Sequence, residues 1–390
     1  MHPWVSGRFP RIGLDTTAPG RSIVRRPSHM TTTRVNEIDL LRFFAALAVV
    51  FFHYSFRGYA ADAMSVMPYP LLASVSKYGY LGVGLFFMIS GFVILMTAAS
   101  GNLRRFVISR IVRLYPAFWA CCTITFAVTI AIGAPRYSAS VGQYLVNMTM
   151  LSGFVGVPSI DGVYWSLFVE LKFYALVAIV LVIGRIHQAQ AFIILWLVAS
   201  VALQLHAIGK LRYLLITDYS AFFIAGAAYF LIWSKGVSLT RTVIVAISWG
   251  LAVFQSIKGL KEFETHYNTS MNSYVIAGVV TTFFAVMMLV SLRRTGWVGR
   301  SRWLLVGVLT YPLYLLHHNI GFMVFNRAYL KVNTHLLFWG AITVALISAY
   351  IVHICVERPF SSPMKAALNK LADRIQRLTL RCSGGAEAGR

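Results

Sequence analysis

The sequence predicts an all-α protein of the polytopic membrane class, a transmembrane helix bundle of about ten spans with no soluble domain. Three observations predict this fold. Only 12% of the 390 residues are charged and 58% are hydrophobic, whereas a soluble chain carries roughly 25% charged residues. The apolar residues form blocks of about 17–22, the length that crosses a hydrocarbon core as a helix. The basic residues gather between these blocks, where lysine and arginine set membrane topology.

The two ends of the chain differ in composition from the apolar blocks. Residues 1–35 are rich in Arg, Pro and Gly and lack the apolar core of a secretory signal peptide, so we expect a disordered basic leader. Translation from Met1 and translation from Met30 both fit this stretch. Residues 36–360 form the predicted membrane domain. Residues 361–390 form a basic, amphipathic tail, which we expect on the anionic cytoplasmic leaflet.

Ten apolar segments are predicted to span the membrane, with both termini in the cytoplasm. Arginine clusters at 104–113 and 293–302 then fall on the cytoplasmic side, as the bias of basic residues toward that side requires. The segments show no internal repeat of the kind found in many transporters. The predicted spans are residues 38–57, 79–99, 115–133, 164–183, 191–206, 213–233, 242–257, 272–292, 304–325 and 336–355.

The net charge of +23 would suggest a nucleic-acid partner in a soluble protein. Here the basic residues flank apolar blocks and show no zinc-finger spacing, so we expect no nucleic-acid binding.

The spacing of the cysteines does not suggest a metal site. None of the four forms a CxxC motif, and we therefore predict no metal site and no structural disulfide. They are Cys121, Cys122, Cys355 and Cys382.

Ionisable residues inside a span are costly in hydrocarbon and are candidates for function. Arg42 and His53 lie in the first span, eleven residues apart. A helix puts both on nearly one face, about 16 Å apart along its axis. A snorkelling arginine and a hydrogen-bonded packing histidine are the alternative interpretations.

Three titratable side chains are expected at one depth. Counting the rise per residue brings Glu170 of the fourth span level with His53 and His317, so the three are predicted to form one polar centre. Glu170 has an alternative as the structural partner of Lys172 or of an arginine. His317 and its neighbour His318 have an alternative as packing residues beside a wet cavity.

Arg110 and Arg113 form an RxxR motif near the predicted cytoplasmic surface. At positions i and i+3 they share a helix face, and guanidinium groups suit phosphate oxygens. The bias of basic residues toward the cytoplasm is the alternative explanation. Small residues of the second span, among them Ser90 and Gly91, allow a helix or a ligand to approach closely.

Taken together and in order, these motifs resemble the acyltransferase-3 family of membrane acyltransferases. The resemblance is collinear over about residues 36–360. The motifs that carry it are EIDLLRFFAALAVVFFH (37–53), GVGLFFMISGF (82–92), RIVRLYP (110–116), YWSLFVELKFY (164–174), LTYPLYLLHH (309–318) and VERPF (356–360).

The resemblance implies an O-acyltransferase of the EC 2.3.1 type in the bacterial inner membrane. Acyl-CoA, with acetyl-CoA as the expected case, would be a co-substrate, and no cofactor would be permanently bound. The acceptor would be a hydroxyl of a cell-surface glycan or glycolipid. Some relatives carry a fused extracytoplasmic domain, so here a periplasmic partner is expected to be a separate protein.

The resemblance also assigns roles to individual residues. His53 becomes the essential histidine with Arg42 as its partner, and Arg110 and Arg113 become the RxxR pair of a donor site. Two departures concern acids, because Gly84 and Leu171 stand where relatives often carry one. The motif of the second span, Ser90, Gly91 and Phe92, is expected in the donor site. The motif of the fourth span is Trp165, Ser166, Glu170 and Tyr174, and its members other than Glu170 are expected, with His317, near the substrate.

The hypothesis for the mechanism follows from these positions. Acyl-CoA would dock through the arginines and carry its thioester toward His53, which would act as a general base or as a transient acyl carrier. Glu170 would orient the imidazole, as the acid of a triad does. The alternatives are a proton-coupled transporter of a small or lipid-linked substrate and a non-catalytic membrane scaffold.

Overall fold

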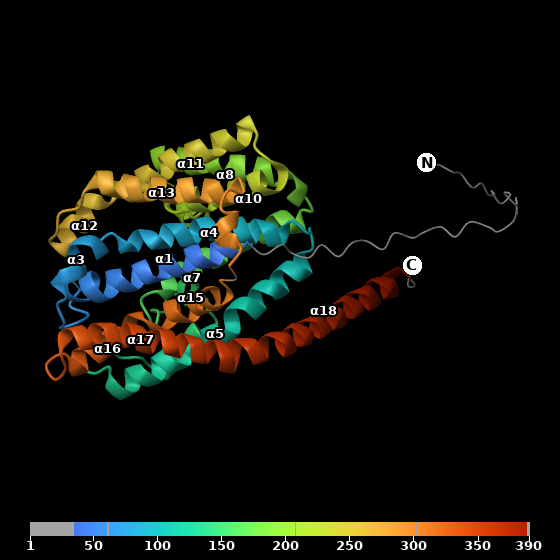
Figure 1. Ribbon diagram of the computed structural model, residues 1–390. Coiled ribbons are helices and arrows are strands. Elements are labelled where there is room, and N and C mark those ends of the chain that lie inside the picture. Colours follow the sequence, from blue (N-terminus) through green and yellow to red (C-terminus); the bar gives the residue numbers. More distant parts are fainter. Residues whose placement is uncertain (1–34, 61, 207, 302, 388–390) are drawn as a thin grey trace, which may run out of the picture. The chain divides into compact units, whose positions relative to one another are not determined.

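The computed structural model describes residues 35–60, 62–206, 208–301 and 303–387. Every regular element within these ranges is a helix, which confirms the predicted all-α fold (Figure 1). Met30 and the predicted leader, apart from Val35, lie outside the described residues.

The helices follow one another through short connections. The first half of the chain contains α1 (Asn36–Phe52), η1 (His53–Arg57), α2 (Gly58–Ala60), α3 (Pro70–Ser76), η2 (Gly79–Leu81), α4 (Gly82–Ala98), α5 (Leu103–Ile132), α6 (Val141–Asn147), η3 (Ser152–Phe154), α7 (Tyr164–Val182), η4 (Ile186–Gln188) and α8 (Ala189–Leu205). The second half contains α9 (Gly209–Leu214), α10 (Ser220–Lys235), α11 (Leu239–Lys258), α12 (Leu260–Tyr267), α13 (Ser273–Ser291), α14 (Gly296–Gly299), α15 (Leu304–Leu316), α16 (His318–Ala328), α17 (Thr334–Val352), η5 (His353–Glu357) and α18 (Arg358–Glu387).

The predicted spans correspond in order to apolar helices of this fold. Within the described residues, eight helical segments are long and apolar enough to cross a bilayer, and α10 and α15 are shorter apolar helices. Helix α5 begins at Leu103, well before the predicted start at residue 115, because the side chain of Asn102 accepts a hydrogen bond from the Arg105 N–H and caps the helix. The RxxR motif therefore lies within this helix and not in a loop before it.

The ninth predicted span, residues 304–325, is not one continuous helix. Helix α15 contains Pro312 and ends at Leu316, and α16 begins at His318. The interruption lies after Pro312, where the backbone N–H of Asn319 donates to the Asp161 carboxylate at 3.0 Å and not to a carbonyl of the helix. Polar side chains cover backbone carbonyls at the break, since Tyr54 donates to the carbonyl of His317 at 2.7 Å. Broken helices at membrane depth require such partners.

Helices α4 and α10 pack backbone to backbone. A Cβ added to Gly91 would collide with the carbonyl of Phe223, and one added to Gly226 would collide with the carbonyl of Met88. Glycine at both positions allows this close approach, as small residues do between membrane helices. The contact packs α10, which is buried over most of its length, directly against α4.

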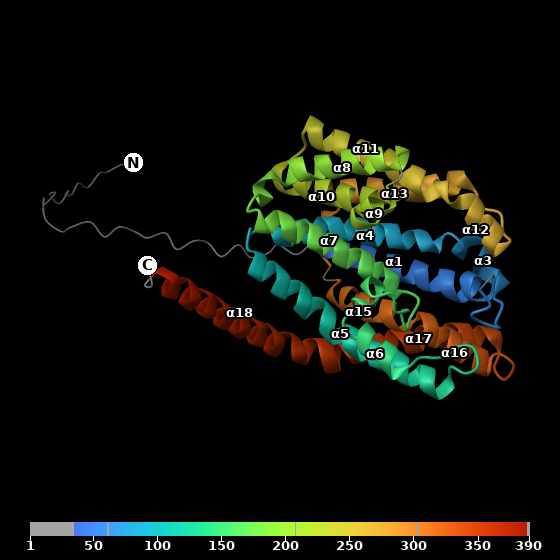
Figure 2. The same ribbon diagram turned by 180° about the vertical axis from the view of Figure 1, so that it is seen from behind.

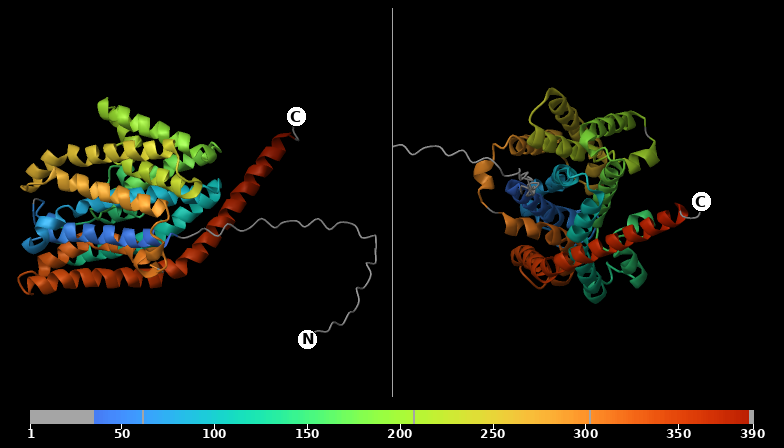
Figure 3. Two further views of the ribbon diagram at one scale, coloured as in Figure 1. Left: turned by 45° about the horizontal axis from the view of Figure 1, so that its top comes forward. Right: turned by 90° about the vertical axis from the view of Figure 1, so that its right-hand side faces the viewer.

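The bundle has two groups of helices with α1 and α4 between them (Figures 1 and 2). Helices α8, α10, α11 and α13 pack together on one side, and α15, α16, α17 and α5 pack on the other. In the end-on view of Figure 3, α1 lies between these two groups. Functional side chains on α1 are therefore surrounded by other helices and largely shielded from lipid.

Helix α18 continues from α17 through η5 without a break in the helical backbone. Arg104 of α5 binds it from the side, donating to the Asp373 carboxylate at 2.6 Å and to the Asn369 carbonyl at 2.8 Å. The predicted tail, residues 361–390, is thus helical through Glu387. Its position on a membrane surface stays a prediction.

Candidate active site

Most of the predicted site residues line two cavities of the bundle. The arginine cavity, of about 350 Å³, is lined by residues that include Arg42, Arg110 and Arg113. The histidine cavity, of about 290 Å³, is lined by residues that include His53 and Arg57. Among the described residues, the two that line both cavities are Val83 and Tyr314, so these side chains lie at the boundary between the two cavities.

The arginine cavity carries positive charge. Arg42 comes from α1, whereas Arg110 and Arg113 come from α5, where they are one helical turn apart. Three guanidinium groups face one carboxylate, that of Glu170, in the described lining of this cavity. Such a surface attracts anions, and guanidinium forks match the oxygens of phosphate groups.

Arg113 also has a carboxylate partner at the edge of the cavity. Its Nη1 atom lies 3.8 Å from Oε1 of Glu357, while the other carboxylate oxygen of Glu357 lies 2.7 Å from Nδ1 of His353. Glu357 belongs to the VERPF motif. The VERPF motif and the RxxR motif are therefore in contact in the structure, through Glu357 of the first and Arg113 of the second.

Glu170 does not share a centre with His53, and this part of the sequence-based prediction is wrong. The carboxylate of Glu170 accepts a hydrogen bond of 2.5 Å from Ser90 Oγ and lines the arginine cavity. Counting residues places a side chain along its own helix, but it does not give the shift or the rotation of that helix against its neighbours. Glu170 therefore faces the guanidinium groups and does not orient the imidazole.

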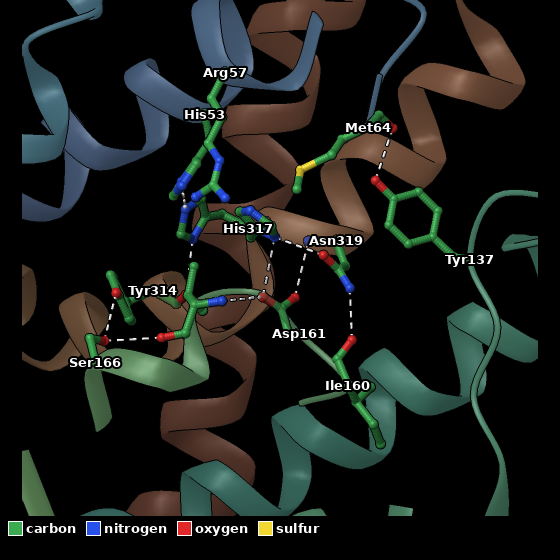
Figure 4. Close-up of polar contacts among 12 residues, drawn as sticks. His53, Arg57, Met64, Tyr137, Ile160, Asp161, Ser166, Tyr314, His317 and Asn319 are labelled. Atoms are coloured by element: carbon green, nitrogen blue, oxygen red, sulfur yellow. Dashed lines mark hydrogen bonds and ion pairs between the residues drawn. The ribbon is translucent and has the colours of Figure 1, made fainter. Parts of the chain in front are cut away.

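The histidine centre consists of His53 and His317 (Figure 4). His53 opens η1, a π-helical turn at the end of α1, and such turns are frequent at functional sites. Its Nδ1 atom lies 2.9 Å from Nε2 of His317. His317 stands at the break between α15 and α16 and is fully buried. The predicted meeting of these two histidines is confirmed.

The hydrogen bonds of this pair determine its tautomers. Nδ1 of His317 lies 2.9 Å from the carbonyl of Tyr314, and a carbonyl can only accept, so this nitrogen carries a proton. In neutral His317, Nε2 is then the acceptor, and His53 must donate its Nδ1–H. Neutral His53 consequently keeps its lone pair on Nε2, while its side chain lines the histidine cavity. A lone pair fixed in this way is what a general base requires.

A buried polar layer lies behind the pair. The rings of His53 and His318 meet edge to face with centroids 4.4 Å apart. Nδ1 of His318 lies 2.7 Å from Oδ1 of Asn319 and 3.4 Å from Oδ1 of Asp161. Asp161 is fully buried and also accepts from the backbone N–H groups of Val163 and Asn319. A buried carboxylate with several donors is well compensated, and it holds this layer in place.

The histidine cavity combines aromatic and polar side chains. Tyr80, Trp165 and Tyr219 line it together with Asp218 and Gln255. The indole of Trp165 and the ring of Tyr219 are tilted against each other with centroids 5.4 Å apart. Aromatic faces next to hydrogen-bonding groups can bind a ligand that has both apolar and polar surfaces.

The motif of the second span divides between two roles. Ser90 lines the arginine cavity and binds Glu170. Gly91 and Phe92 face α10, where Gly91 meets the carbonyl of Phe223 and the ring of Phe92 contacts that of Phe230 with centroids 5.7 Å apart. Both are packing residues and do not line the predicted donor site.

The fourth-span residues line both cavities. Ser166 and Tyr174 line the arginine cavity and Trp165 lines the histidine cavity.

Two residues of the site, Asp161 and Tyr314, were not predicted from the sequence. Asp161 lies in the loop before α7, outside any predicted span, and Tyr314 stands three residues before His317 inside the motif LTYPLYLLHH. The second of these could have been found from that spacing, because residues at i and i+3 share a helix face.

Comparison with known proteins gives a family over most of the chain. The sequence profile of a family described as an acyltransferase domain matches residues 35–354. Nodulation protein 10 of Rhizobium leguminosarum bv. viciae is 29% identical over 171 residues, which are 38% of this chain and 45% of that relative. The matched region thus spans less than half the length of the curated relative. No solved structure matches the chain. With the profile matching residues from the start of α1 to the end of α17, the chain belongs to the acyltransferase-3 family of membrane acyltransferases.

Proposed function

We propose that the protein is a membrane O-acyltransferase that moves an acyl group from acyl-CoA to a hydroxyl of a surface glycan or glycolipid. The observation that carries the proposal is the hydrogen-bonded pair of His53 and His317 beside a cavity, close to a second cavity lined by three arginines. Acetyl-CoA is the proposed donor. The proposed site of action is the bacterial inner membrane, with both termini in the cytoplasm.

The donor would bind in the arginine cavity. Arg42, Arg110 and Arg113 can neutralise the phosphates of coenzyme A, and Ser90 and Glu170 lie on the same wall. From Arg42 to His53 is about 16 Å along the helix axis, which is comparable to the length of a pantetheine arm. The thioester would therefore reach the boundary with the histidine cavity while the nucleotide end stays among the arginines.

The acceptor would enter the histidine cavity, where Trp165 and Tyr219 provide aromatic faces and Asp218 and Gln255 provide hydrogen-bonding groups. Nε2 of His53 takes the proton of the acceptor hydroxyl as its oxygen attacks the thioester carbonyl carbon. A C–O bond forms, the C–S bond breaks, and the proton passes from His53 to the departing thiolate. His317 would orient His53 and stabilise its cation, the role that an acid performs in a triad.

A donor with a stable-isotope label tests the proposal directly. Purified protein in detergent is mixed with labelled acetyl-CoA and with glycans from cell envelopes, and transfer is measured by mass spectrometry. We expect label on an acceptor hydroxyl with the wild type and none with His53→Ala. A protein that neither hydrolyses the thioester nor transfers the acyl group would contradict the proposal and favour the transporter or scaffold alternative.

Rapid quenching without acceptor separates two forms of the chemistry. Label retained on the wild-type protein and absent from His53→Ala would indicate a covalent acyl carrier. Label retained on neither would indicate direct transfer with His53 as the base.

A further inference from the structure

Of the described residues, Tyr314 and Val83 line both cavities, and of these two Tyr314 has the polar side chain. Tyr314 lies in α15 and is buried, with 7% of its surface exposed. Its ring contacts that of Phe86 edge to face, with centroids 5.7 Å apart, and that of His317 at the same separation. These contacts fix the ring at the boundary between the donor side and the histidine side.

The hydroxyl of Tyr314 has a defined direction. It lies 2.7 Å from Ser166 Oγ, which in turn lies 3.0 Å from the carbonyl of Val163 (Figure 4). A carbonyl only accepts, so the single proton of Ser166 is used there. Tyr314 is therefore the donor to Ser166, and its O–H points along the wall of the arginine cavity, to which both residues belong.

A neutral donor that is bound to another hydroxyl can turn to a stronger acceptor at modest cost. The hydrogen bond between Tyr314 and Ser166 joins two uncharged groups, whereas an oxygen that gains negative charge accepts a hydrogen bond about twice as strongly. Two neighbours in the arginine cavity, Ser166 and Glu170, have no proton to donate in its place. Ser166 already donates to Val163, and the Glu170 carboxylate accepts from Ser90.

We propose that Tyr314 is a further catalytic residue, which donates a hydrogen bond to the carbonyl oxygen of the acyl group as that group crosses from the arginine cavity to the histidine cavity. This inference rests on the proposed acyl transfer. As the acceptor oxygen attacks, the carbonyl oxygen becomes an oxyanion, and the Tyr314 O–H stabilises it without giving up its proton. When the C–S bond breaks, the carbonyl re-forms and Tyr314 returns to Ser166.

The proposed reaction gives a role to a tyrosine at the boundary of the two cavities. Donor and acceptor approach from opposite sides, so the reacting carbon must lie at the boundary where both linings are in reach. A donor fixed there by packing is arranged before the reaction, and a prearranged hydrogen bond stabilises an oxyanion strongly. His317 connects the two functions, since it donates to the backbone carbonyl of Tyr314 and accepts from His53.

Tyr314→Phe tests the inference, with Ser166→Ala as the matched control. The phenylalanine variant keeps the ring and loses only the hydroxyl, so we expect kcat to fall about 10²–10³-fold, as on removal of one oxyanion donor. Affinity for acetyl-CoA should stay within about twofold of the wild type. Ser166→Ala keeps the tyrosine hydroxyl and should lose much less activity.

Infrared difference spectra give a readout that a merely structural residue would not move. With acetyl-CoA labelled at the carbonyl carbon and bound to a His53→Ala background, the carbonyl stretch should lie at lower frequency with Tyr314 than with Phe at that position. If Tyr314→Phe does not fold, a fluorinated tyrosine at position 314, which is a stronger donor, should lower the frequency further. Unchanged kcat, or an unchanged stretch in the variant used, would overturn the inference while wild-type transfer still supports the proposed function. Absence of transfer by the wild type would overturn both.

Discussion

Replacing His317 with phenylalanine tests whether this residue controls the chemistry of His53. The variant keeps a ring of similar size and removes the acceptor of the 2.9 Å hydrogen bond from His53 Nδ1. A buried neutral hydrogen bond contributes roughly 0.5–1.5 kcal/mol. At about 1.4 kcal/mol per factor of ten, this bond biases the tautomers of His53 by about 2- to 13-fold toward the form with a free Nε2.

Tautomer bias is the smaller part of the expected effect. His317 also holds the imidazole in one orientation, and a general base as a whole typically contributes about 10²–10⁴-fold to the rate. We therefore expect kcat of His317→Phe to fall by more than about tenfold and by no more than that of His53→Ala. Groups that act as one unit are strongly non-additive, so the double variant should be no slower than His53→Ala.

The assay is steady-state transfer of labelled acetyl groups, with protein folding checked by thermal melting. Tyr54→Phe is the control, because it removes the 2.7 Å hydrogen bond to the backbone carbonyl of His317 but leaves the histidine pair intact. It should lower stability by about 1 kcal/mol and leave kcat close to that of the wild type. A His317→Phe variant within twofold of wild-type kcat would refute the reasoning. So would a double variant whose loss equals the product of the two single losses.

Three further predictions concern the donor site, the helix packing and the topology. Arg110→Ala and Arg113→Ala should each weaken acetyl-CoA binding by roughly 1.5–3 kcal/mol, the value of a hydrogen bond to a charged group, as measured by calorimetry; unchanged donor affinity in both variants would leave these arginines as topology signals. Gly226→Val should lower the melting temperature because its side chain meets α4 backbone, whereas Gly250→Ala has open space and should not; equal melting of the two would contradict the packing argument. A reporter fused after Leu292 should read cytoplasmic, because the arginine cluster at 293–302 follows it, and a periplasmic signal there would disprove the proposed orientation.

The sequence alone determined the class of fold. Blocks of apolar residues that match the bilayer thickness leave a chain few choices, because backbone groups in hydrocarbon must bond within their own segment. Each predicted span accordingly has a helical counterpart in the structure. The motifs around His53, Arg110 and His317 were also visible in the sequence, since ionisable residues within apolar blocks are rare and expensive.

The position of each residue along its own helix could be predicted, but its neighbours on other helices could not. Rise per residue gives a coordinate along the helix axis, and it brought His53 level with His317, where the structure has them in contact. The same count brought Glu170 to that level, yet its carboxylate bonds Ser90 and lines the cavity that contains Arg42. The shift and the rotation of one helix against another decide which side chains meet, and a single sequence gives neither.

Tertiary structure alone decided the rest of the site. Asp161 lies in a loop, and nothing in its local sequence shows that the loop packs against His318. Gly91 resembled a ligand-binding residue, but the close approach of α10 makes it a packing residue. Tyr314 is one of 19 tyrosines and gains its position from the meeting of two cavities. Hydropathy is a property of each segment by itself, whereas a cavity is formed by side chains from several helices and exists only when they pack together.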